Sequence, residues 1–368
     1  MPAASAAQSR RVIPKDSFNK IFSTFKTSSY FDPIAKAPGL HTIRTIDWNP
    51  TGTLVATGSV DRTLRVWNPK ETNIRQSTEL RGHTSGIEKV AFNPAKENEL
   101  ATCSNDGTVK FWDVRTKTRI TSVDVGGDPF TLSWTADGKT LLVGKTDNTL
   151  ASISTSTTST STAKPSQPNP SSPAPLNSYK LLTSHREPLE TNDTCFTHAM
   201  DTENLGLFLT HGDGTVQVVS YPSFEPIYTL NAHTSACLSI ALSPTGRYLA
   251  VGGRDALISL WDTTDWICKR TVSSPRGGAV KGLSWSWDGR FITGAGDEQG
   301  CASGLEIFHA ESGESVYSTA GTSGEPDMGV SAVAWHPNRY ILAYASVYDG
   351  PGNRSSSGLR IVGVGSNY

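Results

Sequence analysis

The chain has 368 residues, of which 36% are hydrophobic and 18% charged, a composition typical of a folded soluble protein and not of a fibrous or wholly disordered one. With 33 Lys and Arg against 34 Asp and Glu, its formal charge of -1 offers no general field for holding a nucleic acid or an anionic membrane. The five cysteines are scattered, which excludes the close pairs of a zinc site or a disulfide scaffold.

The chain begins with an arm, residues 1–29, that differs from the rest in charge and pattern. Residues 1–30 carry five basic side chains and one acidic side chain. Residues 1–11 lack the apolar core of a signal peptide, and no run of eighteen apolar residues follows, so we expect a nuclear or cytosolic protein.

Within the arm, one apolar stripe at helical spacing predicts a short helix. The stripe consists of Phe18, Ile21, Phe22 and Phe25. A helix this short is marginal in water, so the stripe must pack on something. The protein's own body, the groove of a partner and a nonspecific membrane or nucleic-acid contact all stay open, and we treat the four residues as candidate partner contacts.

After the arm, one sequence plan recurs seven times: an alternating strand, a turn, a second strand ending in small residues, a tight Asp turn and a third strand. The copies span residues 43–68, 87–113, 130–154, 195–220, 237–262, 280–309 and 330–364. Their spacing suits blades of four strands, the fourth strand lying in the link to the next copy, as in residues 77–80. Only residues 365–368 follow the last copy, so the missing outer strand is expected near residues 30–35, where it closes the ring.

One long insertion interrupts the repeats. Between Thr155 and Ser178, 17 of 24 residues are Ser, Thr or Pro, and only Lys164 is charged. Such a stretch cannot bury enough apolar surface to offset its ordering entropy, so we predict a mobile loop. The expected organisation is therefore an arm (1–29), a seven-bladed ring (30–364) containing this loop, and a short tail (365–368).

The copies resemble WD-repeat β-propellers. Trp112-Asp113 and Trp261-Asp262 match the family's terminal dipeptide, and Gly82-His83 matches its Gly-His pair. The resemblance implies an all-β fold in which a His, a Ser or Thr, the turn Asp and a Trp form a hydrogen-bonded set in each blade. Leaving a buried member unpaired costs roughly 1–3 kcal/mol. Carried over, the sets are His83, Ser104, Asp106 and Trp112; His41, Ser59, Asp61 and Trp67; and an incomplete set of His233, Asp255 and Trp261, with Gly253 at the hydroxyl position.

The sequence contains no pattern that indicates catalysis. No nucleophile with a base, paired carboxylates or phosphate loop stands out, and the eight histidines lack metal-ligand spacing. The turn aspartates recur once per blade, which favours a structural role, and Trp48, Trp134, Trp285 and Trp335 recur on the first strand as core residues. We therefore expect no enzyme, no metal and no cofactor.

The loops between second and third strands should crowd one face of the ring. Their mixed charges suit a protein-binding surface better than a phosphate groove. The candidate rim contacts are Arg62, Asn105, Lys145, His211, Arg254 and Glu298.

Longer stretches are similar to the Tex-type WD-repeat subunits of the THO complex. They include ATCSNDGTVKFWDVRTKTRI at 101–120 and the link SYPSFEPIYTLNAH at 220–233, where blade links are normally free to vary. The resemblance implies a nuclear, noncatalytic scaffold of the THO/TREX mRNA export assembly. It would bind other THO subunits, chiefly the large THO subunit 2, and meet mRNA and the DEAD-box export helicase indirectly, without a membrane. The alternative is a ubiquitin-ligase substrate receptor or a histone-tail reader in a different nuclear complex.

Overall fold

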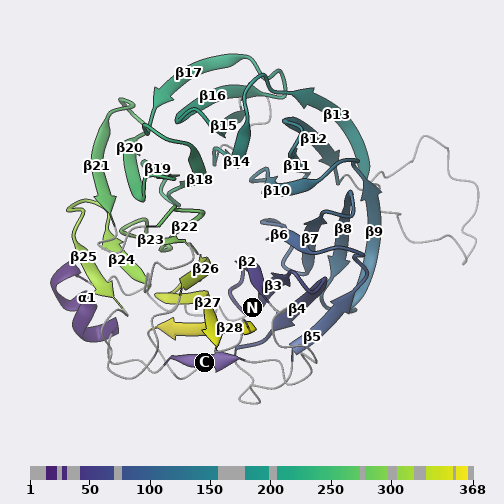
Figure 1. Cartoon of the computed structure of the whole chain (residues 1–368), viewed down its shortest axis with the longest axis horizontal. Coiled ribbons are helices and arrows are strands. Elements are labelled where there is room, and N and C mark those ends of the chain that lie inside the picture. Colours follow the sequence, from purple (N-terminus) through teal and green to yellow (C-terminus); the bar gives the residue numbers. More distant parts are fainter. Residues whose placement is uncertain are drawn as a thin grey trace, which may run out of the picture.

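The computed structural model describes residues 14–22, 27–30, 42–69, 77–155, 179–198, 205–273, 278–296, 305–318, 329–350 and 354–363. Within these ranges the chain forms one helix and 28 strands, which pair into seven four-stranded antiparallel sheets. The sheets stand around a central channel like the blades of a propeller (Figure 1). The predicted seven-bladed ring is therefore confirmed.

Each blade runs outward from the channel, and its strands follow one another in the chain (Figure 1). Blades 1 to 4 consist, in order, of β2 (Ile43–Trp48), β3 (Val55–Ser59), β4 (Thr63–Trp67) and β5 (Ser77–Arg81); β6 (Ile87–Phe92), β7 (Glu99–Ser104), β8 (Thr108–Asp113) and β9 (Thr118–Asp124); β10 (Pro129–Trp134), β11 (Thr140–Lys145), β12 (Thr149–Ser154) and β13 (Lys180–Arg186); β14 (Thr191–Phe196), β15 (Leu205–His211), β16 (Thr215–Tyr221) and β17 (Pro226–Asn231).

The remaining three blades repeat this arrangement, except that the last one takes its outer strand from the N-terminal arm. Blades 5 to 7 consist of β18 (Cys237–Leu242), β19 (Tyr248–Gly253), β20 (Leu257–Asp262) and β21 (Cys268–Ser273); β22 (Gly282–Trp285), β23 (Phe291–Ala295), β24 (Glu306–His309) and β25 (Ser315–Ser318); β26 (Gly329–Trp335), β27 (Ile341–Gly350), β28 (Arg354–Gly363) and β1 (Ser28–Tyr30).

The core lies between neighbouring blades. Second strands such as β7 and β19 are buried along their whole length, because both of their faces pack on other blades, whereas the outer strand β13 is almost wholly exposed. First-strand tryptophans also link blades by hydrogen bonds: the indole N–H of Trp48 donates to the Ala334 carbonyl at 3.0 Å, and that of Trp285 to the Ala241 carbonyl at 3.0 Å. Buried donors with acceptors in the neighbouring blade join the blades to one another.

The N-terminal arm closes the ring, as the strand count predicts. β1 pairs antiparallel with β28, placing Ser29 opposite Arg360 and Tyr30 opposite Leu359. The closing strand lies at 28–30, earlier than the predicted 30–35, because Tyr30 is the residue that turns inward to pack on Trp67 of blade 1. Residues 31–41 lie outside the described part.

The helix of the arm, α1 (Lys15–Phe22), packs on the protein's own ring beside β25 (Figure 1). Phe18 and Phe22 are fully buried; the Phe18 ring centroid lies 4.0 Å from that of Phe291, and the Phe22 ring centroid lies 4.8 Å from that of Tyr317. The prediction that Phe18 and Phe22 contact a partner is therefore wrong. A helix of eight residues is marginal by itself, and α1 is stabilised by packing between blades 6 and 7. Phe25 and the side chain of Ile21 lie outside the described residues.

The prediction that the insertion includes Thr155 is wrong. The backbone N–H of Thr155 donates to the Lys139 carbonyl at 2.8 Å, and its hydroxyl donates to the Gly138 carbonyl at 2.9 Å. Thr155 is therefore part of blade 3, while residues 156–178 lie outside the described part. No helix among the described residues is long and apolar enough to span a bilayer.

Candidate interaction surfaces

The hydrogen-bonded set of blade 2 connects a loop, a turn and two strands. His83 Nδ1 lies 2.8 Å from Asp106 Oδ2, and His83 Nε2 lies 2.8 Å from the hydroxyl of Thr102. The indole N–H of Trp112 donates to the same hydroxyl at 2.9 Å. The hydroxyl of the set is thus Thr102, and the assignment to Ser104 is wrong. Ser104 instead donates to the Ser85 carbonyl at 3.1 Å.

Burial and hydrogen bonds together determine the protonation states of His83 and Asp106. Burial lowers the pKa of His83, which favours the neutral imidazole. For Asp106, burial alone would raise the pKa, but hydrogen bonds from Thr108, Thr84 and His83 outweigh it and hold the pKa well below its usual range. The neutral ring therefore donates from Nδ1 to an ionised Asp106 and accepts from Thr102 at Nε2.

In blade 1, as in blade 2, the hydroxyl that the tryptophan contacts comes from the residue two positions earlier on the second strand than predicted. The indole of Trp67 donates to the hydroxyl of Thr57 at 3.0 Å, while Ser59 donates to the Thr42 carbonyl at 3.0 Å. Asp61 accepts from the backbone N–H of Thr63 at 3.0 Å and so shapes the turn. Ser59 is again not the residue that meets the tryptophan, and His41 lies outside the described residues.

The set of blade 5 is complete, contrary to expectation. His233 Nδ1 lies 3.0 Å from Asp255, and Ser259 of the third strand supplies the hydroxyl, 3.0 Å from His233 Nε2 and 2.9 Å from the Trp261 indole nitrogen. Gly253 is needed for space, because a Cβ there would lie 2.7 Å from His233 Nδ1. The hydroxyl has moved from the second strand to the third.

The predicted rim contacts do not form one surface. Arg62, Asn105 and Arg254 are exposed at their turns, as the repeat pattern suggests. Lys145 is half-buried and donates to the Val125 carbonyl at 3.3 Å. His211 is only 1% exposed, because it ends the buried strand β15, so its assignment as a rim contact is wrong. Glu298 lies outside the described residues.

The central channel has a volume of about 640 Å³ and is lined by the first strands. Its charged side chains have both signs: Arg44 forms an ion pair with Glu88, and Lys89, Asp193 and Lys281 lie around the same space. Asp193 Oδ1 accepts from the Thr131 hydroxyl at 2.9 Å, which ties two blades together. Among the described residues no group of three His, Cys, Asp or Glu side chains is placed to hold a metal ion.

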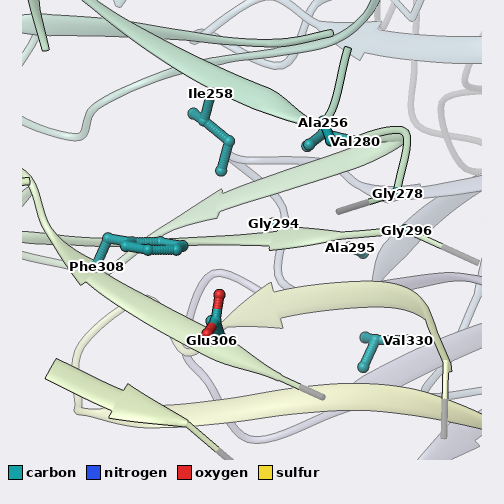
Figure 2. A pocket seen from close by; sticks show the side chains of 10 residues that line it. All are labelled: Ala256, Ile258, Gly278, Val280, Gly294, Ala295, Gly296, Glu306, Phe308 and Val330. Carbon is teal, nitrogen blue, oxygen red and sulfur yellow. The ribbon is translucent and has the colours of Figure 1, made fainter. Parts of the chain in front are cut away.

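A second cavity, of about 40 Å³, lies between blades 5, 6 and 7 (Figure 2). Apolar side chains such as Ile258 and Phe308 line it, and Glu306 is its acidic member (Figure 2). This volume suits one or two water molecules and no larger ligand.

An apolar region on the outer wall was not predicted from the sequence. The exposed large hydrophobic residues of the described chain all lie in blades 2 to 5, and Ile227, at 63% exposed, is the most accessible. They are Ile120, Leu181, Leu182, Leu189, Ile227, Tyr228 and Ile267. Strand alternation predicts that one face of a strand is buried, but an outer strand lies at the end of its blade, where neighbouring blades diverge.

Comparison with known proteins agrees with this architecture. The family model for the WD domain, G-beta repeat, matches residues 38–68, 74–113 and 224–262. The crystal structure of the β-propeller domain of Cps50 (Swd1) from Myceliophteria thermophila superposes with a TM-score of 0.69 at 16% identity, covering 92% of this chain and 100% of that domain. These matches and the seven four-stranded blades define a WD-repeat β-propeller.

Similar proteins indicate to which family of WD-repeat proteins the chain belongs. THO complex subunit 3 of Arabidopsis thaliana is 30% identical over 328 residues, which cover 88% of this chain and 93% of that protein. WD repeat-containing protein AAC3 of Dictyostelium discoideum is 27% identical over 345 residues, covering 87% of this chain and 64% of that protein. The chain belongs to the THO complex subunit 3 family of WD-repeat proteins.

Proposed function

We propose that the chain is a nuclear, noncatalytic scaffold subunit of a THO assembly that couples transcription to mRNA processing and export. The observation that carries the proposal is its similarity to THO complex subunit 3 over 93% of that protein's length. A likeness that covers 88% of this chain supports a shared role of the whole ring.

The geometry supports a role in holding other proteins. The turn aspartates and imidazoles are engaged within their blades, and the exposed turn residues Arg62, Asn105 and Arg254 combine positive and neutral side chains. The near-neutral chain offers no general attraction for RNA, so mRNA and the DEAD-box helicase are met through partners. Among those partners the large THO subunit 2 is the expected direct contact.

Because α1 is buried against the ring, the contact with the large subunit must involve other residues. Phe18 and Phe22 belong to the ring's own core, so they are not available to the large subunit. Deleting the arm would destabilise the fold, so loss of binding in such a variant would not test the contact with the large subunit. The contact with the large subunit therefore falls to the rim or to the outer wall.

Depletion of the protein in its own cells tests the proposed function. We expect polyadenylated RNA to accumulate in the nucleus, measured by in situ hybridisation with an oligo(dT) probe. Re-expression of the wild-type chain should restore the cytoplasmic signal. Normal RNA distribution after complete depletion, together with accumulation of a ubiquitin-ligase substrate or loss of a histone mark, would favour the alternative propeller classes.

A further inference from the structure

The outer strands repeat one irregular position. In blades 2, 3, 4 and 6 the pairing of the outer strand shifts by one residue, and the extra residue is a large aliphatic one. These residues are Ile120, Leu182, Ile227 and Val316. In blade 5 the same position holds Lys269. A β-bulge turns its extra residue away from the ladder, so each of these side chains points out of the regular pattern.

Only one of the four aliphatic side chains is covered. Val316 is 8% exposed because α1 lies over its strand β25, whereas Ile120, Leu182 and Ile227 are 38%, 53% and 63% exposed. Figure 1 shows α1 outside β25, and no other described element lies outside β17. The structure therefore contains one occupied example of a position that is open elsewhere.

On blade 4 the open position is part of a larger patch. Tyr228 follows Ile227 as Tyr317 follows Val316, and both tyrosines occupy the same register. The Tyr228 ring stacks 6.2 Å from Trp266, which the turn before β21 holds at a φ of 55°. Exposed Ile267 adjoins Trp266. We call Ile227, Tyr228, Trp266 and Ile267 the blade 4 patch.

The acidic residue beside the patch corresponds to the acidic residue beside the position that α1 covers. Glu314 precedes β25, its carbonyl accepts from the His309 N–H at 2.9 Å, and its carboxylate pairs with Lys15 of α1. Glu225 precedes β17, and its carbonyl accepts from the Ser220 N–H at the same distance of 2.9 Å. Its exposed carboxylate forms no ion pair within the described residues. Blade 4 therefore presents the acidic group that a helix like α1 would meet with its lysine.

The protein's own long insertion does not suit the patch. Residues 156–178 contain Leu176 as their single large apolar side chain, so they lack a stripe that could cover four apolar residues. An occupant must bring both an apolar stripe and a basic residue.

We propose that the blade 4 patch docks an amphipathic helix of a partner protein that carries apolar residues one turn apart and a basic residue about one turn before them. Trp266 already supplies to Tyr228 the aromatic contact that Phe22 supplies to Tyr317. The helix therefore lies further out, over Ile227 and Ile267, with its basic residue toward Glu225. The site does not depend on which assembly the chain joins.

A peptide copy of α1 is the probe. Residues 14–22 (PKDSFNKIF) are synthesised with a fluorescent label and a lactam between Asp16 and Lys20, an i,i+4 pair that is exposed in α1. Binding to the full chain is measured by fluorescence anisotropy. Because α1 already covers blade 6, peptide that binds without displacing α1 reports on a second site.

We expect saturable binding that Ile227→Glu weakens more than about tenfold, because a carboxylate then replaces the central apolar contact. The matched control Ile120→Glu changes the same bulge position on blade 2, where Thr118 stands in place of Glu225, and should leave binding unchanged. Glu225→Lys should weaken binding about threefold, and a peptide carrying Lys15→Glu should regain the lost affinity.

Three results would overturn the proposal. The first is the absence of saturable binding. The second is binding that Ile227→Glu leaves unchanged, which would mean that the peptide exchanges with α1 on blade 6. The third is a dimer in sedimentation velocity that Ile227→Glu abolishes, since the occupant would then be a second copy of the chain.

Discussion

A single threonine hydroxyl joins the imidazole of His83 to the indole of Trp112. The Thr102 hydroxyl accepts from the Trp112 indole at 2.9 Å and lies 2.8 Å from His83 Nε2, and Thr102 itself has no exposed surface. In blade 5 the equivalent hydroxyl is Ser259, on the neighbouring strand. The requirement is therefore for a hydroxyl at one point in space, and two different strands can supply it.

Replacing Thr102 should weaken the fold more than replacing Ser104. Thr102→Val keeps the shape but leaves a buried indole donor and a buried imidazole acceptor without partners, so we expect a loss of about 2–4 kcal/mol in the free energy of unfolding. Ser104→Ala removes weaker contacts at the turn and should lose about 1 kcal/mol. Urea denaturation of both variants measures the difference, and equal losses would contradict the assignment.

The same set predicts how stability depends on pH. Burial lowers the pKa of His83 in the fold, whereas in the unfolded chain it lies near 6.5. Below about pH 6.5 the unfolded state takes up a proton that the folded state resists, so stability falls from pH 7 to pH 5. His83→Gln cannot titrate and should show a smaller fall over this range in urea denaturation. An equal fall would show that His83 is not responsible.

The sequence identifies most of this set but not its hydroxyl. The order of His83, Asp106 and Trp112 within the repeat predicts their meeting, because each occupies a fixed place in the plan. Thr102 and Ser104 lie two residues apart on one strand and so share a face, which the sequence pattern cannot resolve. Only the direction of the imidazole, with Nδ1 held by the turn aspartate, decides between them.

At the scale of elements, α1 packs against blade 6. Its two phenylalanines join a core cluster with Phe291, Trp335 and Tyr340. The arm packs on β25, the outer strand of blade 6, and then forms β1, the outer strand of blade 7.

Removing one ring of α1 should destabilise the whole protein. Phe22 is fully buried, so we expect Phe22→Ala to lose about 3–5 kcal/mol in the free energy of unfolding, as large-to-small core changes do. Asn19→Ala, on the exposed side of the same helix, should change it by less than about 0.5 kcal/mol. Thermal or urea unfolding tests both variants. A Phe22→Ala protein as stable as the wild type would show that α1 is detached in solution.

The helix was predictable, and its binding place was not. Spacing of Phe18 and Phe22 predicts an apolar stripe, but the stripe is equally compatible with the chain's own gap and a partner's groove. The gap itself depends on the packing of Phe291 and Tyr340, which the local sequence does not reveal. For the same reason the exposed blade 4 patch escaped prediction, since its accessibility follows from the ring and not from residues 226–228.

At the scale of the whole molecule, the two ends of the chain hold the ring closed. β1 pairs with β28, so the last blade contains strands from both ends of the sequence. The repeat count made this closure predictable, because seven copies of three strands with six links leave one outer strand missing. Without β1, the edge of β28 would be open to pairing with another molecule.

Two truncations distinguish the contribution of α1 and β1 to stability from that of the residues before them. Deleting residues 1–30 removes α1 and β1, and we expect a protein that unfolds at lower temperature and aggregates. Deleting residues 1–13 leaves both elements and should preserve the melting temperature. Scanning calorimetry with light scattering measures both. A monomeric, equally stable ring without residues 1–30 would contradict closure by the arm.

The proposed function makes this propeller a stoichiometric scaffold within a THO assembly. Co-expression of the full chain with the large THO subunit of its own organism, followed by native mass spectrometry of the purified material, tests this most directly. We predict a stable complex that contains both proteins in equal numbers. A folded chain that elutes alone, with no mass corresponding to a joint complex, would contradict the account.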